Sequence, residues 1–470
     1  MQHQVLRSPG TTMTITYAVS SAALDALDAQ LQGRLVRPGD VDYDAVRAVF
    51  NGMIERRPAA VAQCQDPVDV ARGIAFAREH DLVLSVRGGG HSVAGNAVCD
   101  GGIMLDLSAM KQLQVDPHRH TARAGAGLTL GELDRGTQQH GLATPLGVMS
   151  GTGIAGLTLG GGLGWLNGRY GLACDNLVAA EVVTVDGDVV RVGPQEHPDL
   201  FWALRGGGGN FGVVTEFSYR LHPVGPVLAG GLAYPWAKAA EVLRFHDEFV
   251  AMAPDELSTA VSLNLDSTGA PTVLVVVCWC GPLEDGERVL GPLRALGPPL
   301  ADTIGVTPYV ALQSAPDAGF PTGRLHYWKS GFLRDLTAGA IATLLEHVPQ
   351  MPSSMGGVGM QRLHGAASRV APTATAFPHR ADQYDLLILA QWENPKDSRR
   401  NIAWARNLFD AMQPHLQDAV YVNNLGAEGP DRVRSAYGPN YRRLAEVKRA
   451  YDPTNVFRLN QNITPETAPA

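Results

Sequence analysis

Three consecutive glycines followed by a histidine constrain this chain more than any other feature of its sequence. The run Arg87-Gly88-Gly89-Gly90-His91-Ser92 comes directly after an apolar stretch at residues 82–86. Because glycine has no Cβ, its backbone N–H groups can approach the phosphates of a ligand closely, while the following imidazole can bond to the same ligand. Sheets of the α/β kind bind their ligands at the carboxyl ends of strands. The segment therefore predicts a strand that ends in a cofactor-binding loop.

The composition is that of an ordinary globular protein and argues against several classes of partner. With 470 residues, of which 45% are hydrophobic, the chain is long enough for roughly two to four domains with full cores. A net charge of −8, without any run of five like charges, argues against a nucleic-acid partner. The apolar run at residues 273–280 is far shorter than the roughly 20 residues of a membrane helix, so we expect no membrane segment.

The cysteines and the first residues bear on the compartment. Residues 1–17 contain neither a basic n-region nor an apolar h-region, so we expect no secretory signal there. Five cysteines are few and odd in number, which argues against a disulfide scaffold and favours a reducing compartment. Cys278 and Cys280 lack the C-x-x-C spacing, and Cys64 and Cys99 have no partner at metal-ligand spacing. We therefore expect a cytoplasmic protein that binds no metal.

Hydrophobic periodicity divides the chain into two regions. Between about residues 45 and 225, short strands and helices alternate, and residues 181–192 form a hairpin with Asp186-Gly187 in its turn. After Pro223 and Pro226 the elements become longer, as in a sheet covered by helices. A capped helix is expected to begin at Asp66-Pro67. Further helices are expected at residues 130–140, 236–252, 284–296, 338–347, 396–412 and 431–450, and strands at 82–86, 103–107, 112–115, 120–124, 257–265, 272–280 and 384–392.

Two segments match the G-x-G-x-x-G pattern of dinucleotide-binding Rossmann units, at residues 151–156 and 207–212. That pattern must follow a strand and open a helix. The first segment instead follows a loop with Pro145, and the second follows a helical stretch and precedes a strand. The first segment is part of a glycine cluster at residues 147–162, which we interpret as backbone that lies close to a flat cofactor and its phosphates.

Several blocks, taken in order, resemble the berberine-bridge-enzyme-like oxidases of the vanillyl-alcohol-oxidase (PCMH-type) flavoprotein family. The blocks are residues 57–63, the His91 loop, and residues 147–164, 169–176, 199–215 and 451–462. The resemblance covers most of the chain and implies an α+β fold of two domains. It implies an FAD-binding domain at residues 1–225 with its core at about 55–225, a substrate domain of antiparallel sheet covered by helices at 226–420, and a C-terminal segment, 421–470, that returns to the first domain.

The resemblance also implies the cofactor and the way it is held. In this family, a histidine at the position of His91 bonds to the 8α-methyl group of FAD. Some relatives add a bond from a cysteine just before the glycine cluster, where this chain has Met149 and Ser150. Cys174 comes more than twenty residues later, so we interpret it as a small buried hydrophobic residue and expect attachment through His91 alone. The expected cofactor-binding residues are Arg87, Gly88, Gly89, Gly90, His91, Ser92, Gly95, Gly147, Gly151, Thr152, Gly153, Gly156, Gly161, Asn460 and Asn462.

One departure from the family pattern bears on the substrate. Carbohydrate-oxidising relatives carry Tyr-x-Asn-Tyr where this chain has Tyr421-Val-Asn-Asn424, and their last tyrosine is thought to deprotonate the substrate hydroxyl. An asparagine cannot serve as a base. We therefore expect a phenol, an amine or an alcohol of the secondary-metabolite kind rather than a sugar.

The proton acceptor must then come from another residue. Tyr327, close to Lys329 in the sequence, is the first candidate, because a cation lowers the pKa of a phenol. Tyr421 is the second candidate if its block is not a regular strand, since side chains alternate along a strand. Gln361 and Gln391, on expected strands, are predicted to orient the substrate by hydrogen bonds.

The expected reaction is hydride transfer from a C–H bond of a small molecule to flavin N5, with reoxidation by dioxygen to hydrogen peroxide. The substrate is expected between the flavin ring and the sheet of the second domain, in a monomer or a homodimer. Three alternatives stay open: a carbohydrate or oligosaccharide oxidase, a dehydrogenase that uses another electron acceptor, and a flavin-binding protein without catalytic activity.

Overall fold

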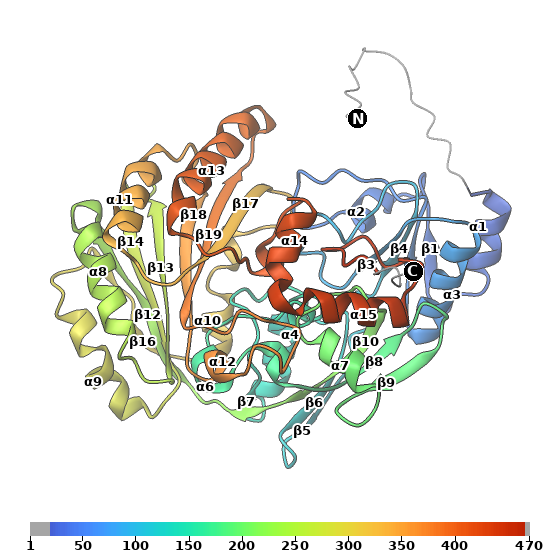
Figure 1. The fold of residues 1–470 in the computed structure, drawn as a ribbon, viewed down its shortest axis with the longest axis horizontal. Coiled ribbons are helices and arrows are strands. Elements are labelled where there is room, and N and C mark those ends of the chain that lie inside the picture. Colours follow the sequence, from blue (N-terminus) through green and yellow to red (C-terminus); the bar gives the residue numbers. More distant parts are fainter. Residues whose placement is uncertain (1–18, 466–470) are drawn as a thin grey trace.

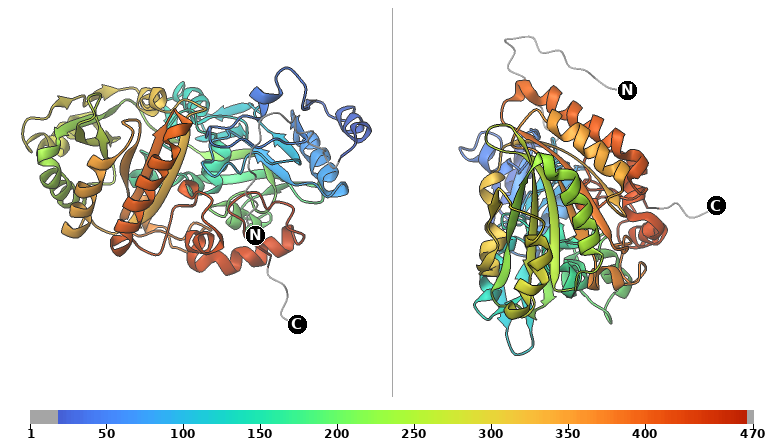
Figure 2. Two further views of the ribbon diagram at one scale, coloured as in Figure 1. Left: turned by 90° about the horizontal axis from the view of Figure 1, so that it is seen from above. Right: turned by 90° about the vertical axis from the view of Figure 1, so that its left-hand side faces the viewer.

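The computed structural model describes residues 19–465. The expectation about a secretory signal at residues 1–17 concerns residues outside this range. Two sheet-containing regions lie side by side along the longest axis of the molecule, one with most of the strands β1 to β10 and one with β12 to β19 (Figure 1). Seen from above, the last helices run along one side of the first region (Figure 2). The α+β content and the two regions confirm the predicted fold class.

A small mixed sheet delivers the glycine–histidine loop. Its strands, in order across the sheet, are β1 (Arg34–Val36), β2 (Ala60–Gln63), β4 (Ile103–Asp106) and β3 (Leu84–Arg87), with helices α1 (Ser21–Asp28), α2 (Tyr43–Arg47) and α3 (Pro67–Glu79). Helix α3 begins where the Asp66 carboxylate accepts the Asp69 N–H, with Pro67 in the first turn. Strand β3 runs parallel to β4 and ends at Arg87, so the glycines leave the sheet at a carboxyl end, as predicted.

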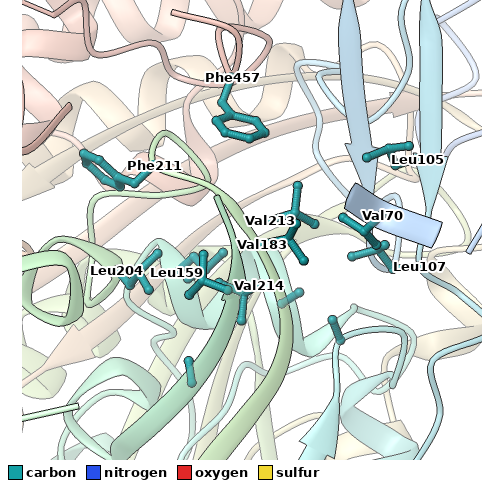
Figure 3. Packing of buried hydrophobic residues seen from close by; sticks show 14 of the residues in the cluster. Val70, Leu105, Leu107, Leu159, Val183, Leu204, Phe211, Val213, Val214 and Phe457 are labelled. Carbon is teal, nitrogen blue, oxygen red and sulfur yellow. The ribbon is translucent and has the colours of Figure 1, made fainter. Parts of the chain in front are cut away.

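An antiparallel sheet packs beside the small sheet. Its strands, in order, are β5 (Leu113–Asp116), β6 (Thr121–Gly125), β10 (Val213–Arg220), β8 (Leu177–Val183) and β9 (Val189–Val192). Strands β8 and β9 form the predicted hairpin, and Gly187 in its turn has a φ of 88°. One buried cluster joins both sheets and includes Val70 and Leu105 on one side and Val183 and Val213 on the other (Figure 3).

Short elements connect these two sheets and surround the glycine cluster. They are α4 (Leu130–Gln138), β7 (Leu142–Ala143), α5 (Ile154–Leu159), α6 (Asn167–Tyr170), α7 (Pro198–Leu204) and β11 (His222–Pro223). Helix α4 begins with a capping box, in which the Thr129 side chain accepts the Glu132 N–H and the Glu132 carboxylate accepts the Thr129 N–H.

A large antiparallel sheet forms the second region, and helices cover its outer face (Figure 1). Its strands are β12 (Val227–Pro235), β13 (Leu257–Leu265), β14 (Pro271–Trp279), β15 (Ala301–Asp302), β16 (Gly305–Thr307), β17 (Leu325–Leu333), β18 (Gly357–Leu363) and β19 (Gln383–Trp392). The covering helices are α8 (Ala239–Val250), α9 (Leu283–Arg294), α11 (Ala338–His347) and α13 (Ser398–Met412), and α10 (Tyr309–Ser314) and α12 (Ala366–Arg369) are shorter. Along β19, Tyr384, Leu386 and Ile388 pack toward the helices, so the residues between them face the first region.

The C-terminal segment corrects one sequence expectation. The single helix expected at residues 431–450 is two helices, α14 (Pro430–Tyr437) and α15 (Tyr441–Tyr451). Gly438, with a φ of 46°, and Pro439, which has no N–H to donate, end the first helix. Helix α15 packs on α7 of the first region, and Phe457 lies in the same buried cluster as Phe211 (Figure 3). The tail thus returns to the first region, while the exact domain boundaries stay predictions.

Two negative findings apply to residues 19–465. No helix in this range is long and apolar enough to cross a membrane. Within the same range, no cluster of three or more histidine, cysteine or carboxylate side chains is arranged to hold a metal ion. All five cysteines are free thiols.

Candidate active site

A cavity of about 820 Å³ lies where the two regions meet. One wall comes from the His91 loop and the glycine cluster of the first region. The opposite wall comes from the inner face of the large sheet, and the C-terminal segment closes one side through residues such as Asn424 and Asn460. The predicted residues that line the cavity are Gly88, Gly89, Gly90, His91, Ser92, Gly147, Thr152, Gly153, Gly156, Gln361, Tyr421 and Asn460.

Two glycine loops touch each other on the floor of the cavity. A Cβ added to Gly89 would lie 2.4 Å from the backbone nitrogen of Gly153, and a Cβ added to Gly153 would lie 2.4 Å from that of Gly89. Any larger residue at either position would separate the loops. The floor is therefore bare main chain, which suits a flat cofactor that carries a pyrophosphate. This cradle and the size of the cavity fit FAD.

His91 lies at the end of this floor with its ring packed on another aromatic ring. Its imidazole stacks on Phe50, with ring centroids 3.8 Å apart and ring planes 16° apart. Burial lowers the pKa of His91 to about 4. The imidazole is therefore uncharged near neutral pH, and one ring nitrogen keeps a lone pair that can form a bond.

Five predicted cofactor-binding residues do not line the cavity: Arg87, Gly95, Gly151, Gly161 and Asn462. Arg87 instead forms an ion pair with Asp106 at 2.6 Å, which fixes the strand before the glycines. Gly95 and Gly161 have φ values of 73° and 124°, so they serve the backbone path of their loops. A role of these five residues in cofactor binding stays a prediction.

The structure places Tyr327 away from the cavity, which argues against the base role expected for it. Its side chain lies on the helix-covered face of β17, and its hydroxyl accepts a hydrogen bond of 2.9 Å from Arg406 on α13. Lys329, on the same face, pairs with Glu428 at 2.6 Å. Neither side chain lines the cavity. The sequence shows that side chains alternate along this strand, but it does not show which face of the strand turns toward the cavity.

Tyr421 lines the cavity, but its hydroxyl is already engaged. The residue precedes a 3-10 turn, Val422–Asn424, rather than lying in a strand. Its oxygen accepts hydrogen bonds from Gly162 N at 2.9 Å, Leu163 N at 3.1 Å and Asn423 Nδ2 at 2.8 Å. Burial raises the pKa of this phenol well above its usual value. Tyr421 therefore holds the glycine cluster in place and is a poor proton acceptor.

The two glutamines differ in their availability. Gln361 on β18 lines the cavity, and its Nε2 has no hydrogen-bond partner among the described residues. Gln391 on β19 donates to Gly319 O at 2.8 Å and lies outside the lining. Gln361 is thus free to bind a substrate, whereas Gln391 fixes the loop before β17.

Asp385 is a residue that the sequence analysis missed. It lies on β19 directly opposite Gln361 in the strand register, so both side chains occupy one patch of the cavity wall. Its carboxylate accepts hydrogen bonds from Ser330 Oγ at 3.1 Å and Asn424 Nδ2 at 2.7 Å. Burial raises the pKa of Asp385 to about 7. A lone charge within the apolar stretch 384–392 was the signal that could have revealed it.

Most of the remaining wall is apolar. Among the described lining residues, Asp385 is the one carboxylate, and none is lysine or arginine. The indole Nε1 atoms of Trp165 and Trp328 have no hydrogen-bond partner within the part of the chain that is described. Trp165 comes from the first region, and the apolar and aromatic lining residues of the second region include Val276, Leu312, Phe320, Trp328, Met355, Met360, Leu387 and Leu389.

Cys174 lies outside the cavity. Its side chain is fully buried, and its Sγ is 4.0 Å from the guanidinium of Arg380, which pairs with Asp175. Burial raises the pKa of this thiol far above its usual value, so it stays protonated. This placement agrees with its interpretation as a small buried residue.

Two protein-family models match this chain, one in the first region and one in the C-terminal segment. A family model described as FAD binding domain matches residues 58–193, and one described as Berberine and berberine like matches residues 420–464. The (R)-6-hydroxynicotine oxidase of Paenarthrobacter nicotinovorans is 35% identical over 459 residues, which cover 94% of this chain and 98% of that protein. An uncharacterised FAD-linked oxidoreductase of Bacillus subtilis is 33% identical over 444 residues, covering 93% and 98%.

Two solved structures match nearly the whole chain. The crystal structure of 6-hydroxy-D-nicotine oxidase from Arthrobacter nicotinovorans matches with a TM-score of 0.86 at 33% identity, covering 93% of this chain and 99% of that one. The berberine-bridge-enzyme-like protein 1 of Physcomitrella patens matches with a TM-score of 0.87 at 23% identity, covering 95% and 100%, and so shares the fold.

Proposed function

The chain belongs to the berberine-like family of FAD-linked oxidoreductases, and we propose that it is an oxidase with FAD bonded to His91 alone. Its substrate is proposed to be a small, largely apolar phenol, amine or alcohol. The observation that carries this proposal is the pairing of Asp385 and Gln361 on the apolar wall opposite the glycine floor and His91. When bound, FAD would accept a hydride from a substrate carbon.

Asp385 is the proposed proton acceptor. Oxidation of an alcohol or amine carbon requires that the neighbouring O–H or N–H gives up its proton. With a pKa of about 7, the Asp385 carboxylate is available at neutral pH and still basic enough to take that proton. Asn424 donates to Asp385 Oδ2 at 2.7 Å, so it positions the base where carbohydrate-oxidising relatives have a tyrosine. Gln361, whose amide has an unused donor, would hold a polar atom of the substrate.

The lining supports an uncharged or cationic aromatic substrate. Apolar and aromatic side chains dominate the wall, and the described lining residues include no cation to bind a carboxylate or phosphate. A relative at 35% identity is named for (R)-6-hydroxynicotine. We therefore favour a phenol or an amine over an oligosaccharide, with dioxygen as the electron acceptor. The small and odd number of cysteines, all of them free thiols, supports the proposed cytoplasmic location. A monomer or a homodimer is proposed as well.

The attachment is tested by acid precipitation of the purified protein. The wild type should keep its yellow colour in the pellet, because a covalent bond survives denaturation. His91→Ala should release its flavin into the supernatant, and the matched variant Cys174→Ala should retain it. Retention of flavin by His91→Ala would contradict attachment through His91 alone.

The reaction is tested by a screen of phenols, amines, alcohols and sugars. Anaerobic bleaching of the flavin absorbance identifies a substrate, and a coupled peroxidase assay in air detects hydrogen peroxide. We expect a phenol or an amine to bleach the flavin and to yield peroxide in proportion to substrate consumed. Bleaching by sugars alone would contradict the proposed substrate class, and turnover without peroxide would contradict the role of dioxygen.

A further inference from the structure

The ring on which His91 packs belongs to neither the glycine loop nor the cavity wall. Phe50 lies just after α2, far from His91 in the sequence, and is only 4% exposed. Its ring stacks on His91 at 3.8 Å between centroids, and on its other side it stacks on His326 at 4.5 Å with planes 24° apart. Phe50 is therefore the middle ring of a stack of three, here called the His91–Phe50–His326 stack.

Hydrogen bonds fix the backbone that carries Phe50 to both halves of the site. Phe50 N donates to Gly90 O at 3.0 Å, directly before His91. Asn51, which is 3% exposed, donates from Nδ2 to Val93 O at 2.9 Å and accepts the His326 N–H on Oδ1 at 3.0 Å. The cofactor loop and strand β17 are thus tied together through two consecutive residues.

His326 supports the stack from the second region. Its side chain is buried, and neither ring nitrogen has a hydrogen-bond partner among the described residues. Burial lowers the pKa of His326, as it does for His91, to about 4. Both imidazoles are therefore uncharged near neutral pH and do not repel each other across Phe50. His326 packs against the face of the Phe50 ring that is turned away from His91.

We infer that Phe50 is a positioning residue for covalent attachment of the flavin, holding the His91 imidazole in one orientation toward the 8α-methyl group. This inference rests on the proposed bond between His91 and FAD. Three glycines before His91 leave the loop few side-chain contacts of its own, so the ring needs an external surface to fix its plane. A stacked aromatic ring supplies that surface without itself bonding either imidazole nitrogen.

The attachment reaction shows why orientation matters. One bond forms between an imidazole nitrogen of His91 and the 8α-carbon, while a methyl C–H bond and the imidazole N–H bond break. The two electrons released pass through the flavin ring to dioxygen, and with the two protons they give hydrogen peroxide. Bond formation within a bound complex depends steeply on the alignment of the reacting atoms, and a displacement of about 1 Å can slow it roughly 100-fold.

The experiment measures attachment rather than turnover. Wild type and variants are produced with limited riboflavin, purified, and incubated in air with excess FAD. Samples are precipitated with acid over time, and flavin is measured in the pellet and the supernatant. Phe50→Leu, which keeps an apolar side chain but removes the flat face, should slow attachment about tenfold or more, with total flavin per chain unchanged. Phe50→Tyr should restore the rate, because it provides a ring again.

Matched variants separate positioning from general damage. Phe217→Leu removes a fully buried phenylalanine on β10 that does not touch His91, and should attach flavin at the wild-type rate. Equal rates for Phe50→Leu and wild type would overturn the inference, as would slow attachment in Phe50→Tyr or a proportional loss of total flavin in Phe50→Leu. Complete release of flavin by the wild type would instead overturn the proposed covalent bond itself.

Discussion

Tyr421 and Asp385 both line the cavity, and their different hydrogen-bond partners give them different roles. The Tyr421 hydroxyl accepts three hydrogen bonds, two of them from the backbone of the glycine cluster, and is fixed by them. The Asp385 carboxylate accepts two, and burial brings its pKa to about 7. A carboxyl group that has a pKa near neutral and faces an apolar cavity is suited to proton transfer. A hydroxyl that accepts hydrogen bonds from another segment is suited to holding the two segments together.

The role of Asp385 gives a prediction about pH. Burial raises its pKa from 3.8 to about 7, and only the ionised form accepts a proton, so the rate of anaerobic flavin reduction should rise with pH and level off above about 7. Asp385→Asn should lower the plateau by roughly 10²- to 10⁴-fold and remove this pH dependence. Stopped-flow spectroscopy with an identified substrate measures both effects.

Tyr327→Phe is the matched control for that measurement. Its hydroxyl binds Arg406 on the far face of β17, so the rate should change by less than about threefold, well under the range for a lost base. A wild-type rate in Asp385→Asn would show that the proton leaves by another route.

Only part of this site was predictable at the residue scale. The His91 loop could be identified because its chemistry is contiguous in sequence. Asp385 could not, because its partners Asn424 and Gln361 are brought to it by strand register and by the return of the chain end. Phe50 gave no signal at all, since a lone phenylalanine in a sequence has no visible partner.

At the scale of elements, local signals were sufficient for most helices and strands. Helix α11 and strand β13 begin and end where the periodicity predicted, and α3 begins at its aspartate cap. The C-terminal helix was predicted too long, although Gly438-Pro439 was visible in the sequence. Apolar residues recur with helical spacing on both sides of Gly438-Pro439, so the pattern predicted one helix where the structure has two.

Helix α15 carries a buried ion pair that should stabilise the returning tail. Lys448 Nζ lies 2.6 Å from Asp452, both side chains are fully buried, and the ammonium also donates to Asn210 O and Phe457 O. Lys448→Met leaves the Asp452 carboxylate buried without its cation. We expect the free energy of unfolding to fall by about 3–5 kcal/mol, measured by urea denaturation.

The same helix offers a control. Arg442 and Glu446 form an exposed pair at 3.4 Å, and such pairs contribute at most about 1 kcal/mol. Arg442→Met should therefore change the urea midpoint little. Equal effects of the two variants would mean that Lys448 acts through helix propensity or net charge rather than through its buried pair.

At the scale of the whole molecule, the arrangement of the two regions creates the site, and this arrangement is the part least accessible from sequence. Family resemblance predicted which regions would exist, but not which side chains would meet across them. One such contact joins α4 to α10, where Gln313 Nε2 donates to Asp134 Oδ2 at 3.0 Å. Asp134, Gln313 and Tyr309 are fully buried there, beside the apolar end of the cavity that Leu312 lines.

This contact makes the stability of the molecule depend on pH. Burial raises the pKa of Asp134 from 3.8 to about 7, so the folded state keeps a proton that the unfolded chain loses above about pH 4. The stabilisation is complete below the unfolded pKa and is lost as pH rises toward about 7. Asp134→Asn, which carries no charge, should match the wild type near pH 4 and exceed its free energy of unfolding by about 1–4 kcal/mol at pH 8. Denaturation curves across this range measure the difference, with the exposed Asp335→Asn as a control that should follow the wild type. Parallel curves for wild type and Asp134→Asn would mean that the buried carboxyl finds a compensating partner, such as a water molecule, between the two regions.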